Sequence, residues 1–199
     1  MQVASAEGYV RDPELVINFY NERRKQLLDV EPNAGHIGLV ELEKDFNVTV
    51  VTQNVDNLHE RAGSTRIIHL HGELTKVCSS RDPYNPRYVK ELKPEEYEVK
   101  MGDKAGDGSQ LRPFIVWFGE AVSEIETAVD YVEKADIFVI IGTSMNVYPA
   151  AGLLNYVPRT AEVYLIDPKP VDTHSMRQIH IIQKGASEGV KELKKLLSV

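Results

Sequence analysis

The chain has 199 residues, of which 42% are hydrophobic and 27% charged, a composition typical of one soluble globular domain. Its net charge of −7, with lysines and arginines dispersed along the chain, argues against nucleic-acid binding, which requires a basic patch. The longest apolar run, 137–141, is far shorter than the ~20 residues of a membrane span. The first fourteen residues also lack the basic-then-apolar pattern of a secretory signal. We therefore expect a cytoplasmic protein that binds neither nucleic acid nor membrane.

Residues 13–46 are predicted to be mainly helical. Pro13 follows Asp12, a pair suited to the start of a helix, and Asn33 is suited to capping a second one. The second helix would carry apolar side chains at Ile37, Val40 and Leu42. These features predict a small helical part at the front of the chain.

Short β-branched runs then alternate with helical patterns up to the C-terminus. The predicted strands are 48–53, 67–71 (ended by Gly72), 114–118 (closed by Gly119), 137–141, 162–166 and 179–182. The predicted helices are 57–62, 122–135, 149–155 and 188–197. Strands that are apolar on both faces and alternate with helices indicate a parallel sheet covered on both sides. We expect a single doubly wound α/β domain of Rossmann-like type, made of 48–77 and 113–199.

Residues 78–112 interrupt this rhythm with a polar stretch rich in charge, proline and glycine. The stretch is expected to contribute little to the core and to form an inserted subdomain. It contains the only cysteine, Cys78, which excludes an internal disulfide and leaves no cysteine pair for zinc.

Three predicted strands end in polar clusters: 53–56 (Gln-Asn-Val-Asp), 142–144 (Gly-Thr-Ser) and Asp167. Ligands of doubly wound sheets bind beyond the carboxyl ends of the strands, so we expect all three at one edge. Each has a plain alternative, since polar turns also satisfy their own backbone and Asp167 precedes Pro168 as a turn initiator would. No Gly-x-Gly-x-x-Gly segment occurs.

Two histidines, His69 and His71, are two residues apart on a predicted strand and should therefore face the same side. A metal hydrolase built on them is disfavoured because only His59 offers a nearby third ligand. His71 is thus a candidate general base, with a structural strand-end histidine as the alternative.

Four ordered segments resemble signatures of the sirtuin family of NAD-dependent protein deacylases. They are 52–63 (TQNVDNLHERAG), 69–74 (HLHGEL), 115–120 (IVWFGE) and 141–150 (IGTSMNVYPA). The resemblance extends over essentially the whole chain.

The resemblance implies NAD as co-substrate, an acylated lysine in a protein or peptide as substrate, and nicotinamide and O-acyl-ADP-ribose as products. His71 would be the general base that deprotonates the nicotinamide ribose. The implied cofactor contacts are Gln53 and Asn54 at that ribose, Asp56 at the carboxamide and Val55 in the same loop. They also include Gly142, Thr143, Ser144 and Asp167 at the adenosine half, and Ala186 near the adenine. The implied substrate-binding residues are Val116, Trp117, Phe118, Gly119 and Glu120.

Tyr20 and Arg23 resemble the Tyr-x-x-Arg pair of the sirtuins that accept acidic acyl groups. Arginine pairs bidentately with a carboxylate, so succinyl- or malonyl-lysine is expected beside acetyl-lysine.

Two features differ from the family pattern. Three of the four zinc cysteines are missing, so we expect no zinc. The chain opens at 3–9 with what resembles the segment after the family's Gly-Ala-Gly-x-Ser turn, so the first strand and the pyrophosphate-binding loop are expected to be missing. The alternative function is therefore an impaired, truncated fragment that at most binds acyl-lysine or a partner. The oligomeric state is left open.

Overall fold

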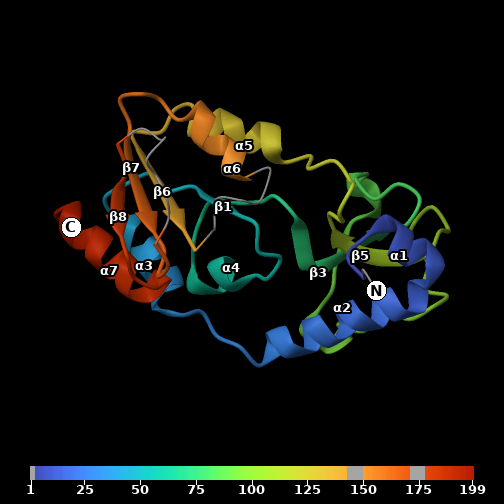
Figure 1. Cartoon of the computed structure of the whole chain (residues 1–199). Coiled ribbons are helices and arrows are strands. Elements are labelled where there is room, and N and C mark those ends of the chain that lie inside the picture. The colour runs from blue at the N-terminus through green and yellow to red at the C-terminus, as the bar shows by residue number, and fades with distance from the viewer. Residues whose placement is uncertain (1–2, 143–149, 171–177) are drawn as a thin grey trace. The chain divides into compact units, whose positions relative to one another are not determined.

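The computed structural model describes residues 3–142, 150–170 and 178–199, and the chain forms two compact units (Figure 1). The first unit comprises Met1–Glu31, Thr52–Asn57 and His69–Val122, and the second comprises Pro32–Val51, Leu58–Ile68 and Ser123–Val199. The boundary at residue 31 divides the predicted helical part, 13–46, between the two units.

The second unit contains the parallel sheet that the sequence predicts. Strands β6 (Ile137–Ile141), β7 (Glu162–Ile166) and β8 (His180–Ile182) pair in that order, and the partners of β6 and β7 run from Ile137↔Glu162 to Ile141↔Ile166. Successive residues of β7 point to opposite faces, yet Val163, Leu165 and Ile166 are all at most 1% exposed. The central strand β7 is therefore buried on both faces, as its continuous apolar run indicates.

Helices α3 (Ala34–Leu42) and α7 (Ala186–Leu196) lie side by side against this sheet (Figure 1). Apolar side chains from both helices and the sheet form one core: Leu42, Tyr164, Ile166, Ile182, Val190 and Leu193. Gly189 permits the close approach of α7 to β7, because a Cβ there would lie 2.1 Å from Ile166 Cγ2. Each fully buried aliphatic side chain contributes about 1.5–3 kcal/mol to folding.

The remaining helices of the second unit also occur where they are predicted. They are α4 (Leu58–Ala62), α5 (Ile125–Val132) and α6 (Ala150–Leu153), the last continued by the 3₁₀ turn η3 (Leu154–Tyr156). Residue 149, the predicted start of α6, lies outside the described residues.

The first unit is built on an antiparallel sheet, which the sequence analysis did not predict. Strands β3 (Gly72–Ser79), β4 (Lys90–Glu91) and β5 (Leu111–Ile115) pair in the order β4-β3-β5. The strand predicted at 114–118 is thus wrong in two respects, since β5 ends at Ile115 and pairs antiparallel with β3. It ends there because residues 117–120 turn back on themselves, with Glu120 N–H donating to the Trp117 carbonyl.

The stretch 78–112 contains short strands and turns and supplies a few residues to the core. It includes parts of β3 and β5 and the 3₁₀ turns η1 (Pro86–Tyr88) and η2 (Pro94–Glu96). Its Val99 is 2% exposed and packs in one cluster with Ile17 and Val77. Only three of the buried apolar residues among those described lie in this stretch, namely Cys78, Val99 and Ala105, so it contributes little to the core, as expected.

Both predicted helix caps are confirmed. Asp12 ends α1 (Ala6–Arg11) and caps α2 (Pro13–Leu28), its carboxylate accepting from Leu15 N–H at 3.0 Å. The Asn33 side chain accepts from the N–H groups of Gly35 and His36 at the start of α3. Such caps are each worth about 1 kcal/mol.

A further pair of short strands, β1 (Val50–Thr52) and β2 (Ile67–His69), forms a two-stranded sheet. The predicted strand 67–71 ends two residues early, because Leu70 and His71 form a turn and Gly72 starts β3 rather than ending a strand. Gly72 has φ +80°, and a Cβ there would lie 2.1 Å from the Phe114 carbonyl oxygen. His69 and His71 therefore do not share the face of one strand. Among the described residues, no helix is long and apolar enough to span a bilayer.

Candidate active site

The loop after β1 carries the predicted cofactor contacts 53–56, and its backbone is fixed by local bonds. Thr52 Oγ1 accepts from Asn54 N–H at 3.0 Å, and the Val55 carbonyl accepts from Leu74 N–H at 2.7 Å. The side chain of Asn54 is exposed, whereas Gln53 and Asp56 are half-buried. These bonds involve Thr52 and the backbone, and the loop presents amide and carboxylate groups at 53–56.

His71 lies beside this loop and belongs to the same unit. Its Nδ1 is 3.1 Å from the Gln53 carbonyl oxygen. Because a carbonyl only accepts, this contact requires the proton on Nδ1 and leaves Nε2 of the neutral ring as an acceptor. The arrangement suits a general base whose reactive nitrogen is Nε2. His69 makes a similar but longer contact, with Nδ1 3.3 Å from the Asn54 carbonyl oxygen.

The segment 116–120 joins His71 through its backbone, because Val116 N–H donates to the His71 carbonyl at 2.9 Å. Trp117 is 2% exposed, whereas Phe118 next to it is 78% exposed. Phe118 N–H donates to the Ala4 carbonyl at 3.1 Å, so the segment is also held on its other side. The predicted base and part of the predicted substrate segment are therefore brought together.

Glu120, a predicted substrate contact, faces inward instead. Its carboxylate forms a largely buried ion pair with Arg112, a residue that the sequence pattern does not single out. Burial alone would lower the pKa of Arg112, but the hydrogen bonds and charge of partners such as Glu120 raise it overall. Only the fold brings the two together, so no sequence pattern indicated the pair.

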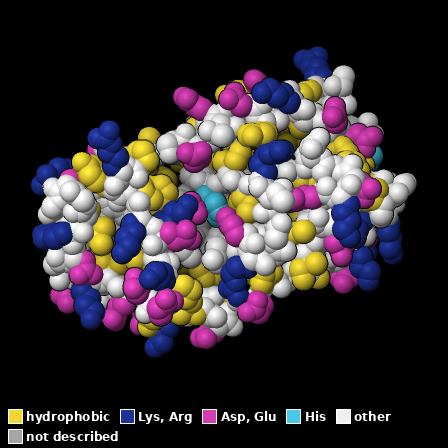
Figure 2. All heavy atoms as spheres, turned by 180° about the vertical axis from the view of Figure 1, so that it is seen from behind, with side chains coloured by type: hydrophobic (Ala, Val, Ile, Leu, Met, Phe, Trp, Pro, Cys, Tyr) yellow, Lys and Arg dark blue, Asp and Glu magenta, His cyan; other side chains and the backbone are white. Residues whose placement is uncertain are grey.

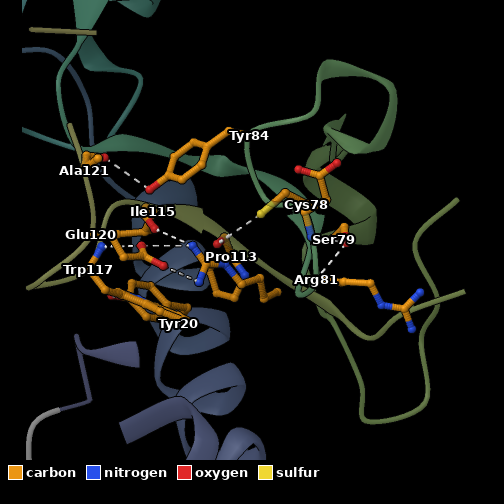
Figure 3. Close-up of polar contacts among 12 residues, drawn as sticks. Tyr20, Cys78, Ser79, Arg81, Tyr84, Pro113, Ile115, Trp117, Glu120 and Ala121 are labelled. Atoms are coloured by element: carbon orange, nitrogen blue, oxygen red, sulfur yellow. Dashed lines mark hydrogen bonds and ion pairs between the residues drawn. The ribbon is translucent and has the colours of Figure 1, made fainter. Parts of the chain in front are cut away.

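Tyr20 and Arg23, the predicted acyl-selecting pair, lie one helical turn apart on α2. The Tyr20 hydroxyl accepts from Trp117 Nε1–H at 3.1 Å, and burial raises the pKa of Tyr20 (Figure 3). Arg23 is exposed, donates to Gln26 at 2.9 Å and lies over the Phe19 ring at 5.0 Å. The structure thus places Tyr20 against the substrate segment, whereas the contacts described for Arg23 are with other residues of α2.

In the second unit, two predicted cofactor positions end neighbouring parallel strands, as expected. Gly142 follows β6 with φ +61°, and its N–H donates to the Ile166 carbonyl at 2.9 Å. Asp167 follows β7, and its carboxylate accepts from Lys169 N–H at 2.8 Å, so it does initiate a turn. Ala186 is the first residue of α7. Thr143 and Ser144 lie outside the described residues.

The side chains and backbone at these positions fit NAD chemically. Amides and carboxylates such as those of Asn54 and Asp56 suit ribose hydroxyls and a carboxamide. At Gly142, no described residue other than its chain neighbours lies within 4 Å of where a Cβ would stand, so those residues leave the backbone open to a ligand. Figure 2 shows acidic and basic side chains interspersed over the face drawn, without the basic stripe of a nucleic-acid binder.

Comparison with known proteins agrees with this fold. The Sir2 family model matches residues 1–149. An NAD-dependent protein deacylase of Bacteroides thetaiotaomicron is 84% identical over 196 residues, covering 98% of this chain and 84% of the relative. A crystal structure of a Sir2 homologue–NAD complex superposes with a TM-score of 0.83 at 33% identity, covering 98% of this chain and 77% of that one. A Sir2–p53 peptide–NAD⁺ structure superposes with a TM-score of 0.80 at 26% identity, covering 98% and 82%.

The fold and the relatives that the chain matches define an α/β enzyme of the NAD-binding class. Given the family match and the 84% identity, the chain belongs to the Sir2 family, the sirtuins.

Proposed function

We propose that this chain removes acyl groups from lysine side chains of proteins, with NAD as co-substrate and His71 as the general base. Its class, an NAD-dependent protein deacylase, follows from its membership of the Sir2 family and its identity to the Bacteroides enzyme. The roles of single residues and the range of acyl groups are the parts proposed.

The observation that carries the proposal is the position of His71. Its Nδ1 is held by the Gln53 carbonyl, which makes Nε2 the proton acceptor, and its own carbonyl is bonded to Val116. One residue thus connects the proposed ribose-binding loop to the proposed substrate segment. A base in such a place is oriented before either substrate binds.

NAD would supply the ribose carbon that receives the acyl oxygen, with nicotinamide as the leaving group. On the chain's side, Gln53, Asn54 and Asp56 would hold the nicotinamide ribose and carboxamide, with Val55 fixing the loop by its carbonyl. The adenosine half would be held by the remaining proposed contacts, Gly142, Thr143, Ser144, Asp167 and Ala186.

The acylated peptide would lie along Trp117–Gly119, where Phe118 is exposed, with Val116 beside His71. The Sir2 relative solved with a p53 peptide supports a peptide substrate. Tyr20 contacts Trp117 and would face the acyl group, while Arg23 would pair with the carboxylate of succinyl- or malonyl-lysine. Acetyl-lysine would be accepted as well.

The test compares wild type with His71→Ala for release of nicotinamide from acetyl-lysine and succinyl-lysine peptides. Loss of a general base is expected to reduce turnover by about 10²- to 10⁴-fold with both peptides. The matched control is His69→Ala, which removes the other histidine facing a loop carbonyl and is expected to stay within a few-fold of wild type. Equal turnover by wild type and His71→Ala would contradict the mechanism. Peptide binding without any wild-type turnover would favour the impaired binder.

A further inference from the structure

A buried arginine, Arg112, lies behind the proposed substrate segment. It is 4% exposed, and its two terminal nitrogens donate to the two carboxylate oxygens of Glu120, at 2.8 and 3.1 Å. One of them also donates to the Ile115 carbonyl at 3.2 Å. The guanidinium carbon is 3.9 Å from the centre of the Trp117 ring, within cation–π range. Arg112 therefore holds both ends of the 117–120 turn.

Glu120 connects Arg112 to the backbone of the turn. Its carboxylate accepts from Trp117 N–H at 2.8 Å, while its own N–H donates to the Trp117 carbonyl at 2.9 Å. The two bonds close a four-residue turn with Phe118 and Gly119 at its centre. Gly119 has φ +92°, the conformation that the third position of such a turn favours for glycine. The turn is thus closed by a side chain as well as by the backbone.

The turn leaves the side chain of Phe118 exposed to solvent. Phe118 is 78% exposed, whereas Trp117 before it is 2% exposed and the Glu120 side chain, two residues after it, is 16% exposed in its pair with Arg112. Figure 3 shows Glu120, Trp117 and Tyr20 gathered together, with Arg81 pointing away from them. Tyr84 of the inserted stretch also reaches this region, its hydroxyl donating to the Ala121 carbonyl at 3.2 Å.

We propose that Arg112, acting through Glu120, is a positioning residue that holds Trp117–Gly119 in the conformation that receives the acyl-lysine peptide. This inference rests on the proposed function, because it takes that segment as the peptide site. A bidentate arginine–carboxylate pair fixes orientation as well as distance, which one ammonium group cannot do. Arg112 is buried and the Glu120 side chain is 16% exposed, so removing the carboxylate strands a buried charge and loosens the turn.

The test uses two variants that keep side-chain volume and change one property each. Arg112→Lys keeps the charge and loses the fork, and Glu120→Gln keeps an acceptor for Trp117 N–H and loses the charge. The affinity for a fluorescently labelled acyl-lysine peptide is measured by anisotropy without NAD. We expect binding weakened by about tenfold, a KM for peptide raised by a similar factor, and a KM for NAD within about twofold of wild type.

The emission of Trp117 gives a readout in the free protein, because it is the only tryptophan of the chain. Removing the guanidinium from its ring face is expected to change that emission in Arg112→Lys. The matched control is Arg81→Lys, an exposed arginine of the same unit, which is expected to leave emission and affinity unchanged. Thermal unfolding shows whether each variant is folded. If Arg112→Lys does not fold, the peptide affinity of Glu120→Gln alone tests the inference.

Peptide affinity equal to that of wild type in the folded variants would overturn the inference. A loss of NAD and peptide affinity in equal measure would overturn it too, since that indicates a general structural role. The proposed function fails separately, if wild type binds the peptide but does not release nicotinamide.

Discussion

Two consecutive arginines of α2 lie in opposite environments. Arg24 is 3% exposed, donates to the Leu74 carbonyl and to Asn21, and has its pKa lowered to about 10 by burial. Arg23 is exposed and makes only local contacts among those described. Arg24 is thus held by contacts within the fold, whereas the side chain of Arg23 can turn towards a ligand at little cost in free energy.

Of the proposed acyl-selecting pair, Arg23 is expected to supply the preference for acidic acyl groups. Arg23→Met removes the carboxylate partner, and a charge-assisted hydrogen bond is worth about 1.5–3 kcal/mol, or roughly 10- to 100-fold. We predict that kcat/KM for a succinyl-lysine peptide falls by that factor, while kcat/KM for the acetyl-lysine peptide is unchanged. Nicotinamide release with both peptides is the measurement.

The matched control is Lys25→Met, which removes a neighbouring exposed cation from the same helix. It is expected to leave both rates unchanged. Full desuccinylation by Arg23→Met would remove the proposed role of this arginine.

At the scale of elements, the inserted stretch is held by hydroxyl and carboxylate groups. The Asp107 carboxylate accepts from the Ser109 N–H and hydroxyl, at 3.0 and 2.7 Å, and from the Ser79 hydroxyl at 2.7 Å. Ser79 Oγ in turn accepts from the N–H groups of Arg81 and Asp82. These bonds, led by those from Ser109, lower the pKa of Asp107 to about 2.

The lowered pKa of Asp107 predicts how the stability of the fold depends on pH. A carboxylate whose pKa falls on folding stabilises the folded state at pH values above its unfolded pKa, which is 3.8 for Asp107. This contribution is lost as the pH falls through the folded pKa of about 2. We predict that Asp107→Asn is less stable than wild type at pH 7. The difference should shrink between about pH 4 and pH 2. Urea unfolding over a pH series measures it.

The exposed Asp130 of α5 supplies the control, since Asp130→Asn is expected to track wild type at every pH. A difference between wild type and Asp107→Asn that stays constant down to pH 2 would count against a role for the charge.

The elements differ in how far the sequence predicted them. Strands β6 and β7 were predicted at their observed bounds, because continuous apolar runs identify buried parallel strands. The antiparallel pairing of β3 with β5 was missed, because it joins segments such as Cys78 and Arg112 that are far apart in the chain. Pairing over such a distance depends on the surrounding packing, which no local pattern encodes.

The candidate site shows the same contrast. His71 and the 53–56 loop were found from their motifs, and the structure brings them together. Arg112 was missed, because an arginine in a polar stretch looks like surface until its carboxylate partner is known. Glu120 was predicted to contact the substrate because its position in a motif does not reveal which way its side chain points.

At the scale of the whole molecule, the number of cysteines determines whether the chain can build a cysteine zinc site. The chain has one cysteine, Cys78, which is fully buried, and burial raises the pKa of its thiol. A structural zinc site needs several ligands, and cysteine binds zinc as the thiolate. We predict less than about 0.1 zinc per purified chain by mass spectrometry, and an unfolding midpoint that EDTA shifts by less than about 1 °C.

Stoichiometric zinc, or marked destabilisation by EDTA, would contradict that prediction. The same measurement in the presence of added zinc separates loss during purification from absence of a site.

The alternation of the two units along the chain limits how the protein can be dissected. Three segments of each unit follow one another in turn, so a cut between residues 32 and 122 divides both. Cutting after Val122 releases a piece with the whole parallel sheet and α7, but without α3, which supplies Leu42 to the core around Ile166. Neither unit can therefore be produced as a continuous fragment, and fusion partners or reporters belong at the ends of the chain rather than at the boundary between units.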